Sequence, residues 1–263
     1  MAVKGGDMDE VLQGLADQQQ ELTDLVAGRR DDEWALPSAC AGWSVGDVVL
    51  HLIQTNDMAI ASCEGRFDEL IRSPLYAPDE TVTSLDDVVD LAVRRARGAT
   101  PAELLEQWQD GAQRLIGALD AAGASARVPW VVGTLSAKTL ATTRIAETWI
   151  HTGDVAVGLG VELAPTDRLF QIARLSWRTL PHAFGRVGLE PPGPVGFDLV
   201  GPHGDAWQFG MALDDGAAPP TVISGTALDL VRVASQRYTA DQSGLVGTGP
   251  DAEQVLRLVR SWA

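Results

Sequence analysis

The sequence has few of the residues that mark a disulfide-stabilised or a nucleic-acid-binding protein. Its 263 residues include two cysteines, Cys40 and Cys63, which do not form a C-x-x-C pair and are too few for a disulfide framework. Lys and Arg together number 20 against 36 Asp and Glu, for a formal net charge of -16. No basic stripe is present, and neutralising phosphates supplies much of the affinity of nucleic-acid binders. We therefore expect no nucleic-acid partner.

Long apolar runs are also missing. No stretch approaches the roughly 20 apolar residues needed to cross a bilayer. Residues 1–20 lack the continuous apolar segment of a signal peptide. We therefore expect no membrane association, a cytoplasmic location and a small-molecule substrate as the partner, with a homodimer left open. The hydrophobic content of 45% is enough to build a core without disulfides.

Helical patterns dominate the first part of the chain. Apolar residues recur at intervals of three and four, and several segments begin with a capping residue, most clearly Thr100 followed by Pro101 and Glu103. Helices are predicted over residues 8–26, from Ser44 through Ile53, and over residues 85–97, 100–119, 136–158 and 166–180. Residues 64–84 are predicted to be irregular, and residues 128–139 to be a loop or a short extended segment.

The pattern changes near residue 190. The Pro- and Gly-rich run LEPPGP precedes three short segments with strand character, VGFDLV, DAWQFG and TVISG. Two helices are predicted to follow, over residues 226–238 and 251–262. The sequence therefore predicts an α+β protein, with a helical domain over residues 1–188 and a smaller α+β domain over residues 189–263.

Three side chains in predicted helices have the chemistry of a metal site. Glu147 and His151 are four residues apart, so both leave the same helix face, and His51 lies on another helix that could meet them across a bundle. Two imidazoles and one carboxylate bind zinc in many enzymes, and also suit iron, manganese or nickel. The residues alone leave two other interpretations open: a surface Glu–His pair, and a hydrogen-bonded core histidine.

The surrounding residues carry a family resemblance. PSACAGWSVGDVVLHL (residues 37–52) and ATTRIAETWIHTGDVAVGLGV (residues 141–161) resemble the mycothiol-dependent maleylpyruvate isomerase family of the DinB-like metalloproteins. That family has a Trp shortly before a helical His, then Glu-x-x-x-His-x-x-Asp on a later helix. Trp43, His51, Glu147, His151 and Asp154 occupy these positions. The C-terminal region resembles an actinobacterial subgroup labelled with a wyosine base formation domain.

The resemblance implies a fold, a cofactor and a cosubstrate. It implies a DinB-like four-helix bundle in which His51, Glu147 and His151 hold a divalent ion, usually zinc. It also implies a small thiol such as mycothiol as cosubstrate, in isomerisation or thiol transfer on a small electrophile. Arg237 is the closest counterpart of the arginine with which the second domain of the family holds an anionic substrate.

Two further residues near the metal-site pattern are candidates for a role. Arg144, three residues before Glu147, could bind a substrate carboxylate or be a solvated charge. Asp154, three residues after His151, could orient its ring or cap the helix. Two other functions stay open: a thiol-independent cyclase, lyase or hydrolase with the same metal ligands, and a non-catalytic small-ligand-binding metalloprotein.

Overall fold

The computed structural model describes residues 7–80, 82–213 and 216–261. Its contacts divide the chain between Leu163 and Ala164 into two compact units, of which the first is helical and the second contains a mixed sheet. This confirms the predicted α+β class and the N-terminal helical bundle. The division lies before the predicted boundary at residues 188 and 189, because the helices between Ala164 and residue 188 pack with a strand and helices that follow this boundary. The extent of independently folding domains stays a prediction.

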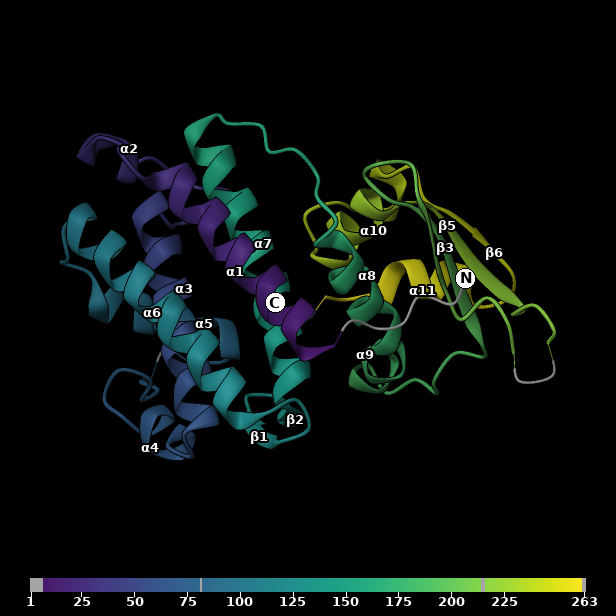
Figure 1. Cartoon of the computed structure of the whole chain (residues 1–263), viewed down its shortest axis with the longest axis horizontal. Coiled ribbons are helices and arrows are strands. Elements are labelled where there is room, and N and C mark those ends of the chain that lie inside the picture. Colours follow the sequence, from purple (N-terminus) through teal and green to yellow (C-terminus); the bar gives the residue numbers. More distant parts are fainter. Residues whose placement is uncertain (1–6, 81, 214–215, 262–263) are drawn as a thin grey trace. The chain divides into compact units, whose positions relative to one another are not determined.

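The long helices in the described part of the N-terminal unit form a bundle (Figure 1). They are α1 (Met8–Val26), α3 (Val45–Cys63), α6 (Pro101–Ala122) and α7 (Ala137–Leu159). The shorter elements between them are α2 (Asp31–Trp34), α4 (Phe67–Ile71), α5 (Leu85–Ala96) and the hairpin of β1 (Arg127–Trp130) with β2 (Gly133–Ser136). The helix α4 falls in the segment predicted to be irregular, and the hairpin occupies most of the predicted loop.

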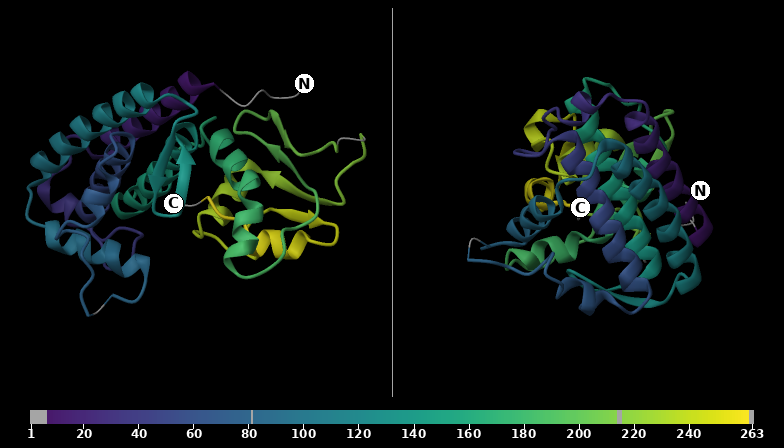
Figure 2. Two further views of the ribbon diagram at one scale, coloured as in Figure 1. Left: turned by 90° about the horizontal axis from the view of Figure 1, so that it is seen from below. Right: turned by 90° about the vertical axis from the view of Figure 1, so that its left-hand side faces the viewer.

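The directions of the long helices follow from the pairs of residues in contact. The helices α1 and α7 run parallel, α3 and α6 run parallel, and the two pairs run in opposite directions. Figure 2 shows the long helices lying side by side in two further views. The contacts that set these directions are Gly14 with Ile145, Gln18 with Thr152, Gly46 with Leu104, Asp57 with Arg114, Thr55 with Arg144, and His51 with Glu147. The parallel pair α3 and α6 needs a long crossover, which residues 64–100 provide.

The core of the bundle explains why these segments are helical. The stripe of α1 buries Leu15 and Leu22 completely, and α6 buries Trp108, whose indole N–H donates to Thr23 Oγ1 at 3.0 Å. Burying apolar area of this kind contributes about 25 cal/mol per Å². The helices α3 and α7 also bury several polar side chains among the apolar ones. Such groups need partners inside the bundle.

The described residues of the C-terminal unit form a four-stranded sheet, four short α-helices and a single 3₁₀ turn at Ala240–Gln242. The sheet order is β4 (Ala206–Phe209), β3 (Val195–Val200), β5 (Thr221–Thr226) and β6 (Val246–Thr248), with β3 and β5 parallel and the outer pairs antiparallel. The helices are α8 (Leu169–Arg178), α9 (Leu180–Arg186), α10 (Ala227–Ala234) and α11 (Ala252–Leu258). The predicted helix over residues 226–238 ends early, because Gln236 adopts a left-handed conformation with φ of 61°. None of the helices in the described ranges is long and apolar enough to cross a membrane.

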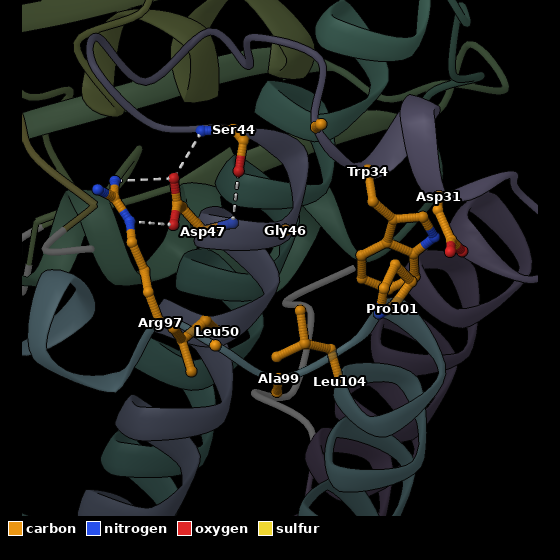
Figure 3. Close-up of a pocket in the computed structure, with 12 residues that line it drawn as sticks. Asp31, Trp34, Ser44, Gly46, Asp47, Leu50, Arg97, Ala99, Pro101 and Leu104 are labelled. Carbon is orange, nitrogen blue, oxygen red and sulfur yellow. Dashed lines mark hydrogen bonds and ion pairs between the residues drawn. The ribbon is translucent and has the colours of Figure 1, made fainter.

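The start of α3 is stabilised by a capping box that also binds the crossover (Figure 3). Ser44 Oγ accepts from the backbone N–H of Asp47, and the Asp47 carboxylate accepts from the backbone N–H of Ser44. The same carboxylate accepts two hydrogen bonds from Arg97, at 2.8 and 2.9 Å. Burial alone would raise the pKa of Asp47, but these hydrogen bonds hold it below its ordinary value.

Replacing Asp47 by Ala should lower the free energy of unfolding by roughly 1–2 kcal/mol, the sum expected for a lost cap and a partly exposed ion pair. The lowered pKa means that this contribution is present above the pKa of the unfolded state, near 4, and is lost as the pH falls through the folded value. Urea titrations at neutral and acidic pH would measure both effects. Asp110→Ala is the matched control, because Asp110 pairs with Arg114 on the exposed face of α6. An equal decrease in the free energy of unfolding for the two variants would contradict the role given to Asp47.

Candidate metal centre

Three donor side chains converge between α3 and α7. His51 Nε2 lies 2.8 Å from Glu147 Oε1, and His151 Nε2 lies 3.8 Å from the same oxygen. One donor atom from each of the three residues lies within 4.8 Å of the others. All three side chains are largely buried, with exposed fractions of 8% or less. The spacing of four residues on α7 and the antiparallel packing of α3 therefore bring together the residues that the sequence pattern selected.

The protonation states in this cluster suit metal binding. Burial lowers the pKa of His51, against the hydrogen bond with Glu147, so its ring is neutral at neutral pH. Burial alone would raise the pKa of Glu147, but the His51 hydrogen bond and the charge of Arg144 hold it well below its ordinary value. A neutral imidazole and an ionised carboxylate are the forms that bind a cation.

Arg144 places a buried positive charge beside Glu147. Only 2% of Arg144 is exposed; its Nη2 donates to Thr55 Oγ1 at 2.8 Å, and its Nη1 lies 4.0 Å from Glu147 Oε1. Its Nε is buried and has no hydrogen-bond partner among the described residues. The interpretation of Arg144 as a solvated surface charge is therefore wrong. Its predicted role in binding substrate stays a prediction.

The far side of the His151 ring is held by Asp154. His151 Nδ1 lies 2.9 Å from Asp154 Oδ2, and Asp154 is 2% exposed. When Nδ1 carries the ring proton, it donates to this carboxylate, and the lone pair of Nε2 points toward Glu147. His51 differs, because its Nδ1 is buried without a hydrogen-bond partner in the described chain. The sequence-based expectation that Asp154 orients His151 fits this contact.

The loop before α3 packs tightly against α7 beside the cluster. The ring of Trp43 lies 5.1 Å from that of His51 between centroids, and its indole N–H donates to Asp90 at 2.9 Å. The backbone N–H of Ala39 donates to the carbonyl of Asp154 at 3.1 Å. Gly158 is what allows this approach, since a Cβ there would lie 2.7 Å from the carbonyl oxygen of Pro37.

One neighbour of the cluster is not evident from the sequence. Cys40 Sγ lies 3.1 Å from Asp154 Oδ2 and 3.6 Å from His151 Nδ1. These partners are more than a hundred residues away along the chain, so local sequence patterns do not indicate the contacts of Cys40. The remaining predicted residue, Arg237, belongs to the C-terminal unit, where its guanidinium donates to the carbonyl of Ser235, and its proposed role stays a prediction.

The donor set fits a divalent ion of the zinc class. In a tetrahedral zinc site, nitrogen and oxygen ligands about 2.0–2.1 Å from the ion lie about 3.3 Å apart. The two nitrogen–oxygen separations here, 2.8 and 3.8 Å, lie on either side of that value.

The hollow of about 240 Å³ that Figure 3 shows is separate from the three donors. It is lined by residues of α2, α3, α6 and the loop before α6, and none of the three donors lines it.

Comparisons with known proteins agree with the fold. The family described as mycothiol maleylpyruvate isomerase N-terminal domain matches residues 15–156. The uncharacterized proteins MT0041 and Rv0036c of Mycobacterium tuberculosis are each 32% identical over 252 residues, which covers 95% of this chain and 93% of theirs. The predicted family resemblance is thereby confirmed for the N-terminal unit. The family match ends at residue 156, so the wyosine label for the C-terminal region stays a prediction.

Two solved structures share the architecture of nearly the whole chain. The crystal structure of the mycothiol-dependent maleylpyruvate isomerase has a TM-score of 0.58 and covers 91% of this chain and 92% of that one. The crystal structure of a histidine-to-alanine mutant of that isomerase has a TM-score of 0.59 and covers 92% and 96%. Both are 19% identical to this chain, so they establish the fold alone.

Gly158→Ala should destabilise the protein by about 1–3 kcal/mol, because the new methyl group overlaps the Pro37 carbonyl and forces the loop away from α7. The matched control is Gly153→Ala in the same helix, where a Cβ meets nothing within 4 Å. That variant should be neutral or more stable by up to about 1 kcal/mol, because alanine favours helix over glycine. Thermal unfolding of both variants measures these effects. A Gly158→Ala protein as stable as the wild type would show that the packing of the loop against α7 does not require glycine at position 158.

Proposed function

The chain belongs to the mycothiol maleylpyruvate isomerase N-terminal domain family, and from this premise we propose that it is a metal-dependent enzyme that uses a small thiol on a small electrophilic molecule. The observation that carries the proposal is the convergence of His51, Glu147 and His151 inside the bundle. Three protein donors leave a coordination position for water, thiol or substrate, which is the arrangement of catalytic rather than structural zinc sites. We name zinc as the ion that this donor set favours, with nickel, iron and manganese as alternatives.

The protein groups around the site have separate tasks in this proposal. His51, Glu147 and His151 would hold the cation, and Asp154 would fix the His151 tautomer through Nδ1. A divalent cation bound there would lower the pKa of a thiol at the remaining position, so that the nucleophilic thiolate is present at neutral pH. No nucleophilic side chain is then required.

Arg144 sets the charge on the protein side of the site. Its guanidinium and the Glu147 carboxylate together are neutral, so an anionic thiol or substrate meets little excess negative charge there. We propose that Arg144 favours such anions from inside the bundle. We also propose that Arg237 contributes to holding an anionic substrate, as the family resemblance implies.

Mycothiol is the thiol that we propose, and isomerisation is the reaction that we test first, since the solved relatives are named for both. In such an isomerisation the thiolate sulfur adds to one carbon of an electron-poor double bond, whose electron pair moves onto the conjugated carbonyl group. The former double bond can then rotate as a single bond. Loss of the same sulfur restores the double bond and returns the thiolate. The thiol is not consumed, and the substrate leaves with its atoms unchanged.

Purified protein should contain about one divalent ion per chain, and Glu147→Gln should weaken its binding. Removal of a direct ligand should cost more than the roughly 10–100-fold lost with an outer hydrogen-bond partner. Elemental analysis and competition with a chromogenic chelator measure both quantities. Glu106→Gln, on the exposed face of α6, is the matched control and should bind the ion like the wild type. Undiminished affinity in Glu147→Gln would remove Glu147 from the ligand set.

Mycothiol should bind the zinc-loaded protein and accelerate the isomerisation of maleylpyruvate, because the site supplies the thiolate. The S-methylated thiol keeps the rest of the molecule but has no ionisable S–H, so it should bind more weakly and support no turnover. Calorimetry and the loss of substrate absorbance measure these two outcomes. If the metal-loaded protein shows no preference for the free thiol, the thiol-independent metalloenzyme becomes the better assignment.

A further inference from the structure

The outward side of His151 faces a second group of metal-binding atoms. Cys40 Sγ, His151 Nδ1 and Asp154 Oδ2 form a triangle with sides of 2.9, 3.1 and 3.6 Å. These three atoms are distinct from the His51, Glu147 and His151 Nε2 donors of the inner site. Asp154 and His151 are nearly buried, whereas Cys40 is partly exposed, so an ion could reach the triangle from the loop side.

The position of Cys40 is fixed by the backbone of its loop. The N–H of Trp43 donates to the carbonyl of Cys40 at 3.0 Å, across a turn in which Gly42 has φ of 80°. A positive φ at the third residue is the requirement of a type II turn. The Cys40 N–H donates to Ser38 Oγ at 3.1 Å. The thiol is therefore held beside Asp154 and His151 by hydrogen bonds that do not involve its sulfur.

The spacing of the three atoms matches a tetrahedral cation site. In a tetrahedral zinc site, sulfur lies about 2.3 Å from the ion and nitrogen and oxygen about 2.0–2.2 Å, so sulfur lies about 3.5–3.7 Å from either of the others, and nitrogen and oxygen lie about 3.3–3.5 Å apart. The sulfur–nitrogen side of the triangle has that length, and the two sides at Asp154 Oδ2 are shorter by about 0.4–0.6 Å. Small movements of one carboxylate would complete the geometry.

The geometry points to an outer site, formed by Cys40, His151 and Asp154, that binds a thiophilic cation such as zinc or cadmium and competes with the inner site for His151. Thiolate ligands select such soft or borderline ions. Binding releases the Cys40 thiol proton to solvent and requires the Nδ1 lone pair of His151. The proton of the neutral ring must then sit on Nε2, so Nε2 can no longer serve the inner site.

This competition gives the outer site a functional consequence. An ion held by Cys40 takes His151 away from Glu147 and His51, so cadmium, which prefers thiolate ligands more strongly than zinc does, should in excess weaken zinc binding at the inner site. The proposal does not require that the inner site uses a thiol or catalyses a reaction. Cys63 offers an internal comparison, because burial and the nearby Glu64 raise its pKa to about 11, and no described metal-binding group includes it.

Alkylation of the two cysteines in the full-length protein tests the outer site. Metal-free protein is treated with iodoacetamide with and without cadmium, and the modification of Cys40 and Cys63 is followed by peptide mass spectrometry. At a cadmium concentration ten times the dissociation constant, modification of Cys40 should slow about tenfold, because the free fraction falls to about one tenth. The rate at Cys63 should not change. In Asp154→Asn, which keeps the side-chain shape, the protection of Cys40 should be lost.

A spectroscopic test separates the outer site from the inner one. In Glu147→Gln, cobalt should give the near-ultraviolet charge-transfer band of a thiolate ligand, because the weakened inner site no longer competes for His151. The band should disappear in Glu147→Gln combined with Cys40→Ser and persist in Glu147→Gln combined with Cys63→Ser. Unchanged alkylation of Cys40 in the presence of cadmium, or a cobalt protein without the thiolate band, would overturn the proposal and leave the triangle as a hydrogen-bonded support for His151. Neither result would affect the metal stoichiometry expected for the inner site.

Discussion

The contact between His51 and Glu147 is the constraint on which the rest of the bundle depends. A carboxylate inside a helical core is unfavourable unless it is paired, because burial disfavours its charged form. Glu147 Oε1 lies 2.8 Å from His51 Nε2, and the side chains of Arg144 and His151 lie within 4.0 Å of the same oxygen. These partners come from two helices, so neither α3 nor α7 can rotate or slide without exposing a charge to an apolar interior. The contact therefore fixes the register of the two helices as well as the geometry of the donors.

The organisation around His151 extends this constraint outward. Each ring nitrogen has a carboxylate neighbour, with Glu147 on one side and Asp154 on the other. The loop carrying Cys40 and Trp43 closes against the same helix, where Gly158 leaves space for the backbone of that loop. The His151 ring therefore lies between the inner site and the partly exposed loop. With the proton on Nδ1, the lone pair of Nε2 is available to the inner site; with the proton on Nε2, the lone pair of Nδ1 is available to the outer site.

Local sequence signals predicted most of the helices, and the family resemblance predicted the bundle. The capping residues of α3 and α6 and the spacing of Glu147 and His151 are short-range features, so sequence reasoning could use them directly. The contacts of Cys40 with Asp154 and of Arg144 with Thr55 join distant segments, and periodicity carries no information about them. The grouping of α8 with the C-terminal sheet was missed for the same reason, because it depends on tertiary packing. The helix α10 ends at Ala234, shortly before the left-handed Gln236, and hydrophobic periodicity did not predict this early end.

The separation of the donors along the chain has a consequence for biosynthesis. His51 and Glu147 are 96 positions apart, and the crossover and α6 must be folded or at least collapsed before the two can meet. Long-range contacts of this kind form late, since closing a large loop has an entropic cost that only the final packing offsets. A chain still emerging from the ribosome therefore has no assembled inner donor set until α7 is complete. Acquisition of a cation there would accompany the last step of folding, when the ion could stabilise the whole bundle at once.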